Sequence, residues 1–145
     1  MTVQITIIGM GQIGTSIGLA LANHTDQVFR VGHDRELSAA NQAKALGALD
    51  RVDINIPHAV EEAGLVILAV PLDQVRETFK SVAQDLRPDV VVMDMAPVKE
   101  TVLSWAKELL PSHAHYVGLV PVISPSYLQT HDSGAESAHA DLFQN

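Results

Sequence analysis

Three glycines near the N-terminus have the spacing of a turn that binds phosphate groups. Gly9, Gly11 and Gly14 form a Gly-x-Gly-x-x-Gly pattern between a β-branched apolar run and a helical pattern. In such a turn the first glycine permits a sharp bend, the second lets the backbone approach a pyrophosphate, and the third lets helix and strand pack closely. Backbone N–H groups around Gln12 and Ile13 would face the phosphates, where the helix dipole favours an anion. This context predicts a dinucleotide site, whereas the glycines alone would also fit a turn without function.

An acidic residue lies where a ribose contact is expected. Asp34 follows Gly14 by 20 residues and comes just after a second strand-like run. A carboxylate there accepts both ribose hydroxyls and repels a 2′-phosphate, which favours NAD over NADP. Arg35 could stack on adenine or reach a 2′-phosphate, so NADP stays as the alternative. Asp34 could also cap the following helix, and the two roles are compatible.

The dipeptide Val70-Pro71 stands at the end of a strongly apolar run. Ligands of doubly wound sheets bind at the carboxyl edge, where the strand order reverses. We therefore expect this backbone to line the cofactor, and the alternative is a proline that only ends a strand. The predicted cofactor-binding residues are Gly9, Gly11, Gln12, Ile13, Gly14, Asp34, Arg35, Val70 and Pro71.

The elements that must position these residues alternate between strand and helix. The patterns predict strands at Thr2–Ile8, Gln27–Gly32, Asp50–Ile54, Leu65–Val70, Asp89–Met93 and Tyr116–Val120. They predict helices at Gln12–Asn23, Glu36–Leu46, Pro57–Ala63, Asp73–Asp85 and Glu100–Leu110. Alternation with short connections is typical of an α/β fold with a doubly wound parallel sheet, a Rossmann dinucleotide-binding domain.

The character of the sequence changes near its end. We expect the Rossmann domain to occupy residues 1–122 and a polar loop or linker to occupy residues 123–145, with a short helix at Glu136–Phe143. The sequence stops without a closing strand, so we expect the natural protein to continue.

Composition narrows the classes of function. The formal net charge is −8, without the Lys/Arg clusters that a nucleic-acid partner requires. The sequence has no cysteine, which excludes disulfides, thiolate zinc sites and cysteine nucleophiles. No signal-peptide pattern and no apolar run of about 18 residues occurs, so we expect a soluble, cytoplasmic protein without a membrane partner.

The ordered motifs GMGQIGTSIGLAL, VGHDRE, LVILAVPL, MDMAPVKETV, YVGLVPVISP and ADLFQN resemble those of prephenate and arogenate dehydrogenases across essentially the whole chain. This resemblance implies NAD(P)-dependent oxidation of a cyclohexadienyl substrate with loss of carbon dioxide, in tyrosine biosynthesis. It also implies a helical C-terminal domain, absent from this sequence, that forms a homodimer and completes the pocket for a small-molecule substrate.

Two positions depart from the family pattern. Where the family has a serine near the reacting hydroxyl, this sequence has Pro97, and where it has the histidine that accepts the hydroxyl proton, this sequence has Val120. Neither side chain can exchange a proton. The alternatives are therefore a non-catalytic or regulatory dinucleotide-binding module, or a related reductase that acts on another small acid or imine.

The sequence does not identify another side chain as catalytic, so the catalytic residues are unknown. Lys99 matches a family lysine and could position substrate or cofactor, although a solvated helix residue is the simpler interpretation. Ser124 and Ser126 fit a structural loop. His113 and His115 would share one face of an extended segment, but without a third ligand nearby we expect no metal site.

Overall fold

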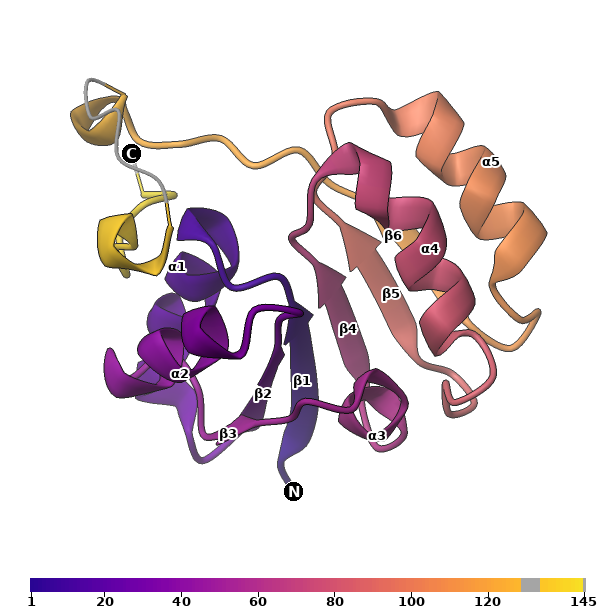
Figure 1. The fold of residues 1–145 in the computed structure, drawn as a ribbon, viewed down its shortest axis with the longest axis horizontal. Helices are drawn as coiled ribbons and strands as arrows, with labels where there is room; N and C mark the ends of the chain where they lie inside the picture. Colours follow the sequence, from indigo (N-terminus) through magenta and orange to yellow (C-terminus); the bar gives the residue numbers. More distant parts are fainter. Residues whose placement is uncertain (129–133, 145) are drawn as a thin grey trace.

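Six parallel strands form one sheet in the order β3-β2-β1-β4-β5-β6 (Figure 1). The computed structural model describes residues 1–128 and 134–144. The strand order reverses between β1 and β4, so that a crevice opens at the carboxyl edge between these two strands. The expected doubly wound Rossmann fold is confirmed.

The strands are short and the helices of moderate length. The strands are β1 (Val3–Ile8), β2 (Val28–His33), β3 (Arg51–Val52), β4 (Leu65–Leu68), β5 (Val91–Asp94) and β6 (His115–Gly118). The α-helices are α1 (Gln12–Ala20), α2 (Leu37–Ala45), α3 (Ile56–Val60), α4 (Leu72–Val82) and α5 (Lys99–Leu109). Short 3₁₀ turns occur at η1 (Ala22–His24), η2 (Pro125–Tyr127) and η3 (Ala135–Ser137).

Helices cover both faces of the sheet, and the side chains along each strand alternate between the two faces. On one face, Ile5 and Ile7 of β1 pack with Ala40 and Ala43 of α2. On the other face, the neighbouring Ile8 joins a larger cluster with residues from α3, α4 and α5. The fully buried Phe79 of α4 lies in that cluster. This two-sided burial explains why the strand sequences are apolar almost throughout.

The main differences from the expected elements lie in the third strand and in the tail. The strand expected at Asp50–Ile54 is only Arg51–Val52, and it lies at the edge of the sheet. The short helix expected at Glu136–Phe143 is wrong, since that region holds only η3 followed by turns. After β6 the chain runs back to the other side of the molecule, where η3 lies beside α1 (Figure 1). There η3 contacts α1 and α2, and the N–H of His139 donates to Ser16 of α1.

A buried arginine of β2 connects α1, α2 and β3. Arg30 of β2 is 4% exposed, and its guanidinium donates to the carbonyls of Gly18 and Gly47 and to both oxygens of Asp50. The hydrogen bond from the Arg30 side chain is the largest influence that lowers the pKa of the Asp50 carboxyl. The ends of α1 and α2 and the start of β3 therefore share one charged anchor.

This anchor predicts a pH dependence of stability. The folded-state pKa of Asp50 is lower than its unfolded value of about 3.9, so the stabilisation is fully present above that value and is lost as the pH falls through the folded pKa. We expect acid to reduce the free energy of unfolding less in Asp50→Asn than in the wild-type protein. Urea unfolding from neutral to acidic pH measures this, with the exposed Asp26→Asn as control. Equal acid sensitivity of the wild type and Asp50→Asn would contradict the expectation.

Candidate functional site

The glycine turn joins β1 to α1 in a conformation that only small residues permit. Gly9 has φ +97°, and a Cβ there would lie 2.4 Å from the carbonyl oxygen of Ala69. A Cβ on Gly14 would lie only 1.9 Å from the carbonyl oxygen of Gly9. A Cβ on Gly11, by contrast, would meet nothing within 4 Å. Gly9 and Gly14 are therefore required by the turn itself, whereas Gly11 faces open space beside the N-terminus of α1.

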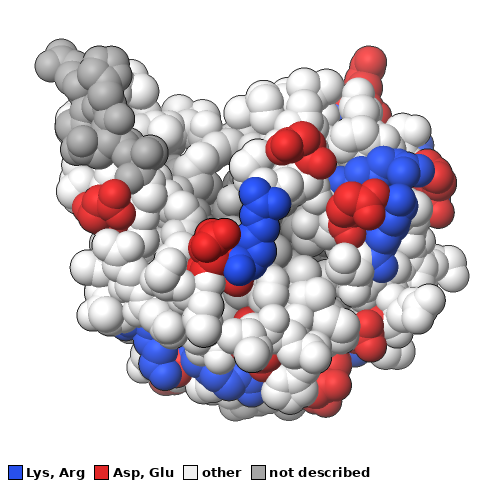
Figure 2. Space-filling view, viewed as in Figure 1, with Lys and Arg blue, Asp and Glu red and all other residues white. Residues whose placement is uncertain are grey.

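That open space belongs to a cavity of about 1010 Å³ along the carboxyl edge of the sheet. Figure 2 shows the molecule hollowed between its two halves, with acidic and basic side chains interspersed around the hollow. The cavity brings together eight of the nine predicted cofactor residues: Gly9, Gly11, Gln12, Ile13, Asp34, Arg35, Val70 and Pro71. Gly14 does not line the cavity and instead packs against Gly9 and Ala69. The volume is at the upper end of the range for ligand pockets, about 300–1,000 Å³.

Asp34 lies at the edge of this cavity and accepts hydrogen bonds from two backbone N–H groups. Its Oδ2 accepts the N–H of Met10 at 2.8 Å, and its Oδ1 accepts the N–H of Glu36 at 2.8 Å. The expectation that Asp34 caps α2 is wrong, because Glu36 occupies the N-cap position. An ionised carboxylate offers about four acceptor positions, so Asp34 retains capacity for further donors. The adjacent Arg35 is exposed and lines the same edge.

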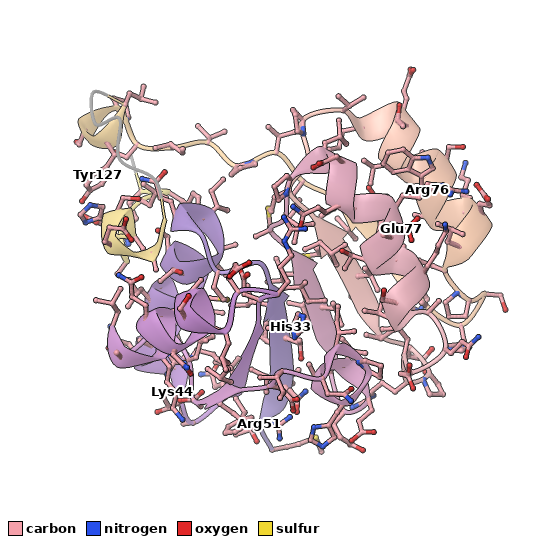
Figure 3. The ribbon with its side chains drawn as sticks, viewed as in Figure 1. His33, Lys44, Arg51, Arg76, Glu77 and Tyr127 are labelled. Atoms are coloured by element: carbon pink, nitrogen blue, oxygen red, sulfur yellow. The ribbon has the colours of Figure 1, made fainter. Side chains whose placement is uncertain are left out.

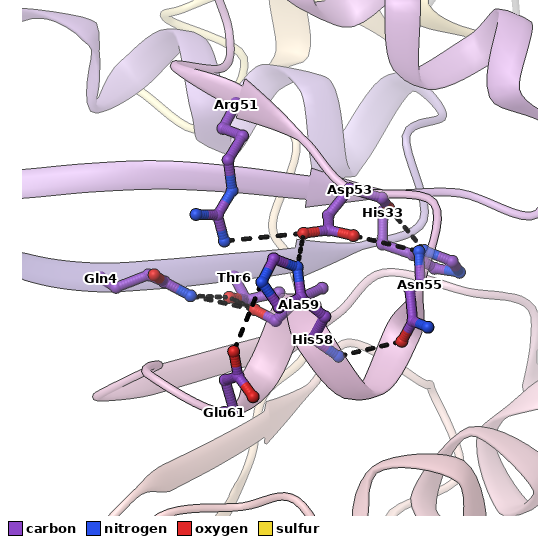
Figure 4. A network of polar contacts seen from close by, with 9 residues as sticks. All are labelled: Gln4, Thr6, His33, Arg51, Asp53, Asn55, His58, Ala59 and Glu61. Carbon is purple, nitrogen blue, oxygen red and sulfur yellow. Dashed lines mark hydrogen bonds and ion pairs between the residues drawn. The ribbon is translucent and has the colours of Figure 1, made fainter.

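A network of polar contacts holds the loop between β3 and α3, next to the cavity (Figure 4). The Asp53 carboxylate contacts His58 Nδ1 at 2.5 Å, and the Asp53 carbonyl contacts His33 Nδ1 at 2.9 Å. Asn55 caps α3 by accepting the N–H of His58. His33 and the first residue of α3, Ile56, both line the cavity. The network therefore positions an apolar side chain and an imidazole at the cavity edge.

The sequence interpretation missed two contributions to the cavity. Polar residues on one face of α4, Gln74, Thr78 and Ser81, line it together with Glu77, which Figure 3 labels on this helix. Their spacing of four and three residues is a helical stripe, and this signal was available in the sequence. Gly134 and Ala135 of the tail also line the cavity. No local pattern predicts their position, because it depends on how the tail returns to α1.

A second polar cluster lies at the carboxyl ends of β5 and β6. The fully buried carboxylate of Asp94 accepts from Lys99 Nζ at 2.8 Å, from the Tyr116 hydroxyl at 2.5 Å and from the Ala96 N–H at 2.8 Å. Lys99 Nζ also donates to the carbonyl of Leu119 at 2.8 Å. Burial first, and then the hydrogen bond to Asp94, raise the pKa of Tyr116 far above its ordinary value. The interpretation of Lys99 as a simply solvated residue is wrong.

Pro97 and Val120, the two positions expected to depart from the family pattern, are close in sequence to members of this cluster. Pro97 is exposed at the end of the β5 loop, and Val120 is 56% exposed after β6. Val98 is 43% and Val122 70% exposed, so further apolar side chains near these positions in the sequence face solvent. The side chains of Pro97 and Val120 offer no proton donor or acceptor.

The remaining candidates do not assemble into a site. His113 Nε2 contacts the carbonyl of Leu86, whereas the exposed His115 lies 3.7 Å from Asp89. Over residues 1–128 and 134–144, no group of three potential metal ligands occurs. Across the same residues, none of the helices has the length and apolarity needed to cross a bilayer.

Comparison with protein families supplies an independent finding. The family described as prephenate dehydrogenase, nucleotide-binding domain, matches residues 17–145. The match begins after the glycine turn, inside α1.

Individual relatives cover the turn as well. A cyclohexadienyl dehydrogenase of Zymomonas mobilis is 33% identical over 98% of this chain and 46% of its own length. A prephenate dehydrogenase of Lactococcus lactis is 30% identical over 98% of this chain and 39% of its own length. The chain thus spans less than half the length of these relatives.

The fold of a solved dehydrogenase agrees closely. The structure of prephenate dehydrogenase from Aquifex aeolicus, in complex with hydroxyphenyl propionate and NAD+, superposes with a TM-score of 0.84 at 24% identity. The similarity covers 99% of this chain and 48% of that one. At this identity the superposition establishes a shared fold.

Proposed function

Because the chain belongs to the prephenate dehydrogenase family, as its nucleotide-binding domain, we propose that it binds NAD as the cofactor half of a dehydrogenase. The observation that carries this proposal is the single cavity that gathers the glycine turn, Asp34 and the Val70-Pro71 backbone. When bound, NAD accepts a hydride from the substrate.

The residues around the cavity fit the chemistry of a dinucleotide. The open space beside Gly11 and the N-terminus of α1 suits a pyrophosphate, because the backbone N–H groups and the helix dipole favour an anion there. The free acceptor capacity of Asp34 suits ribose hydroxyls, and Ile56 offers an apolar surface to a ring. The neighbouring Val70 and Pro71 would line the cofactor through their backbone.

The substrate and the assembly belong to the same proposal. The family indicates prephenate or arogenate, oxidised with loss of carbon dioxide in tyrosine biosynthesis. In this proposal residues 123–145 connect the cofactor domain to a helical domain that completes the pocket and forms a homodimer. The relatives are more than twice as long as this chain, which leaves room for such a domain.

A second candidate function rests on Pro97 and Val120. Without the family's serine and histidine, the domain would bind the dinucleotide and not oxidise prephenate, or it would serve a reductase with a different substrate. Assays of the natural full-length protein with prephenate and arogenate separate these candidates. Turnover comparable to that of other family members would support the dehydrogenase. NADH binding without turnover would support the second candidate.

We expect the protein to bind NADH at least about tenfold more tightly than NADPH, a difference of about 1.4 kcal/mol. The Asp34 carboxylate accepts ribose hydroxyls and repels a 2′-phosphate, and Asp34→Asn removes the charge and should narrow the difference. Fluorescence titration of both dinucleotides against both proteins measures it. If the wild-type protein binds neither dinucleotide, the proposed function is wrong. If NADPH binds as tightly as NADH, only the preference for NAD is wrong.

A further inference from the structure

The last part of the chain, from residue 134 on, packs against α1 and α2. We call residues 134–142 the strap. Ala135, Ser137 and Leu142 of the strap are 3%, 5% and 0% exposed, so this polar segment is anchored by buried side chains. The 3₁₀ turn η3 within the strap packs against both α1 and α2. Figure 1 shows this segment lying over α1, far from the strand β6 that precedes the tail in the sequence.

Two polar side chains of α1 hold the strap. Gln12 Nε2 donates to the carbonyl of Ser137 at 3.0 Å, and Ser16 Oγ accepts the N–H of His139 at 3.0 Å. Gln12 and Ser16 are four residues apart and therefore share one face of the helix. Ser16 is completely buried, and a buried hydroxyl normally has a hydrogen-bond partner. The strap backbone supplies that partner, so the polar face of α1 is matched to the strap.

The strap also forms one wall of the cavity. Gly134 and Ala135 line it together with Glu36 and Ala39, which lie at and near the start of α2. The other end of the strap is fixed to the earlier tail, because the N–H of Ser124 donates to the carbonyl of Leu142 at 2.7 Å. The imidazole of His139 stacks on the Tyr127 ring at 4.3 Å between centroids. The wall is therefore supported from α1, from α2 and from the tail itself.

From this arrangement we propose that the strap is a working part of the dinucleotide site and that Ser16 is its positioning residue. Ser16 is not one of the residues that line the cavity, but it accepts the N–H of His139 and would thereby keep Gly134 and Ala135 in place at the cavity wall. The proposal rests on the proposed cofactor function. It specifies that the strap contacts the ADP-ribose half of NAD, since β1, α1, β2 and α2 form the half of a Rossmann sheet that holds this moiety.

The test compares Ser16→Ala with Ser104→Ala, the same substitution at an exposed position of α5 away from the cavity. Removing the Ser16 hydroxyl leaves the His139 N–H without its acceptor, so we expect the Kd for ADP-ribose to rise about three- to tenfold. The Kd for NADH should rise by the same factor, and Ser104→Ala should bind both ligands as the wild type does. Thermal unfolding of each variant shows whether it is folded at the titration temperature.

A second measurement separates a positioning role from a merely structural one. Saturating ADP-ribose should slow amide hydrogen exchange in residues 134–142 of the wild-type protein and slow it less in Ser16→Ala. If the wild-type protein binds neither ADP-ribose nor NADH, the proposed function is wrong. If it binds both, but Ser16→Ala binds equally well or ADP-ribose leaves exchange in the strap unchanged, the role of the strap is overturned and the cofactor function stands.

Discussion

Replacing Gly11 by alanine is expected to remove most of the affinity for NADH while the domain remains folded. In the structure a Cβ at this position meets nothing within 4 Å, and the backbone φ of −79° is allowed for alanine. The methyl group would instead occupy the space through which the pyrophosphate approaches the backbone. We expect the Kd for NADH to rise at least about tenfold, whereas the free energy of unfolding changes by no more than about 1 kcal/mol.

Gly14→Ala is the matched comparison, with the opposite division of effects. Its Cβ would lie 1.9 Å from the carbonyl oxygen of Gly9, and backbone atoms cannot move away as a flexible side chain can. Overpacking of this kind costs about 1–3 kcal/mol or more, so Gly14→Ala should lose stability before any ligand is added. Urea unfolding and NADH titration of both variants give the two quantities. Unchanged NADH affinity in Gly11→Ala would show that the pyrophosphate does not bind at this turn.

Asp94→Ala is expected to produce the largest loss of stability from a single polar substitution at the carboxyl edge. The fully buried carboxylate accepts from the Lys99 ammonium, the Tyr116 hydroxyl and a backbone N–H. Removing one partner of a buried pair costs about 3–5 kcal/mol. The Lys99 side chain is 32% exposed and can partly rehydrate, which places the expected loss near the lower end, at about 3 kcal/mol.

Tyr116→Phe provides the control for this cluster. It removes one hydrogen bond to Asp94 and preserves the edge-to-face contact with Phe79, whose ring centroid lies 6.1 Å away. We therefore expect a loss of about 1 kcal/mol, well below that of Asp94→Ala. Spectrophotometric titration of Asp94→Ala adds a second measure. Removing the carboxylate in that variant should lower the pKa of Tyr116 toward its ordinary value. Equal losses in the two variants would show that the contacts of Asp94 with Lys99 and Ala96 add no stability beyond the Tyr116 hydrogen bond.

Two groups of polar residues lie in different halves of the sheet, at its carboxyl edge. The glycine turn and Asp34 lie at β1 and β2, whereas Asp94, Lys99 and Tyr116 lie at β5 and β6. The second cluster retains charge and hydrogen bonding but has apolar neighbours at Pro97 and Val120. At these two positions neither the proline nor the valine side chain can donate or accept a proton.

Much of the fold and of the cavity could be predicted because the signals are local. The order of strands and helices follows from hydrophobic patterns within short windows, and the Gly9–Gly14 turn follows from steric limits within one βα unit. Asp34 could be located for the same reason, since the spacing along a βαβ unit fixes its distance from the turn. The sequence alone therefore determined the α/β class, the glycine turn and the place of eight of the nine predicted residues around the cavity.

Tertiary structure decided the contacts between segments that are distant in the sequence. Asp94 and Lys99 are five residues apart in the sequence, but only the pairing of β5 with β6 brings the Tyr116 hydroxyl and the Leu119 carbonyl to them. The strap has no regular pattern of its own, and its conformation depends on Gln12 and Ser16, more than 120 residues earlier. Local patterns carry no information about such partners, because burial and hydrogen bonding are satisfied there by backbone groups brought close only when the whole chain folds.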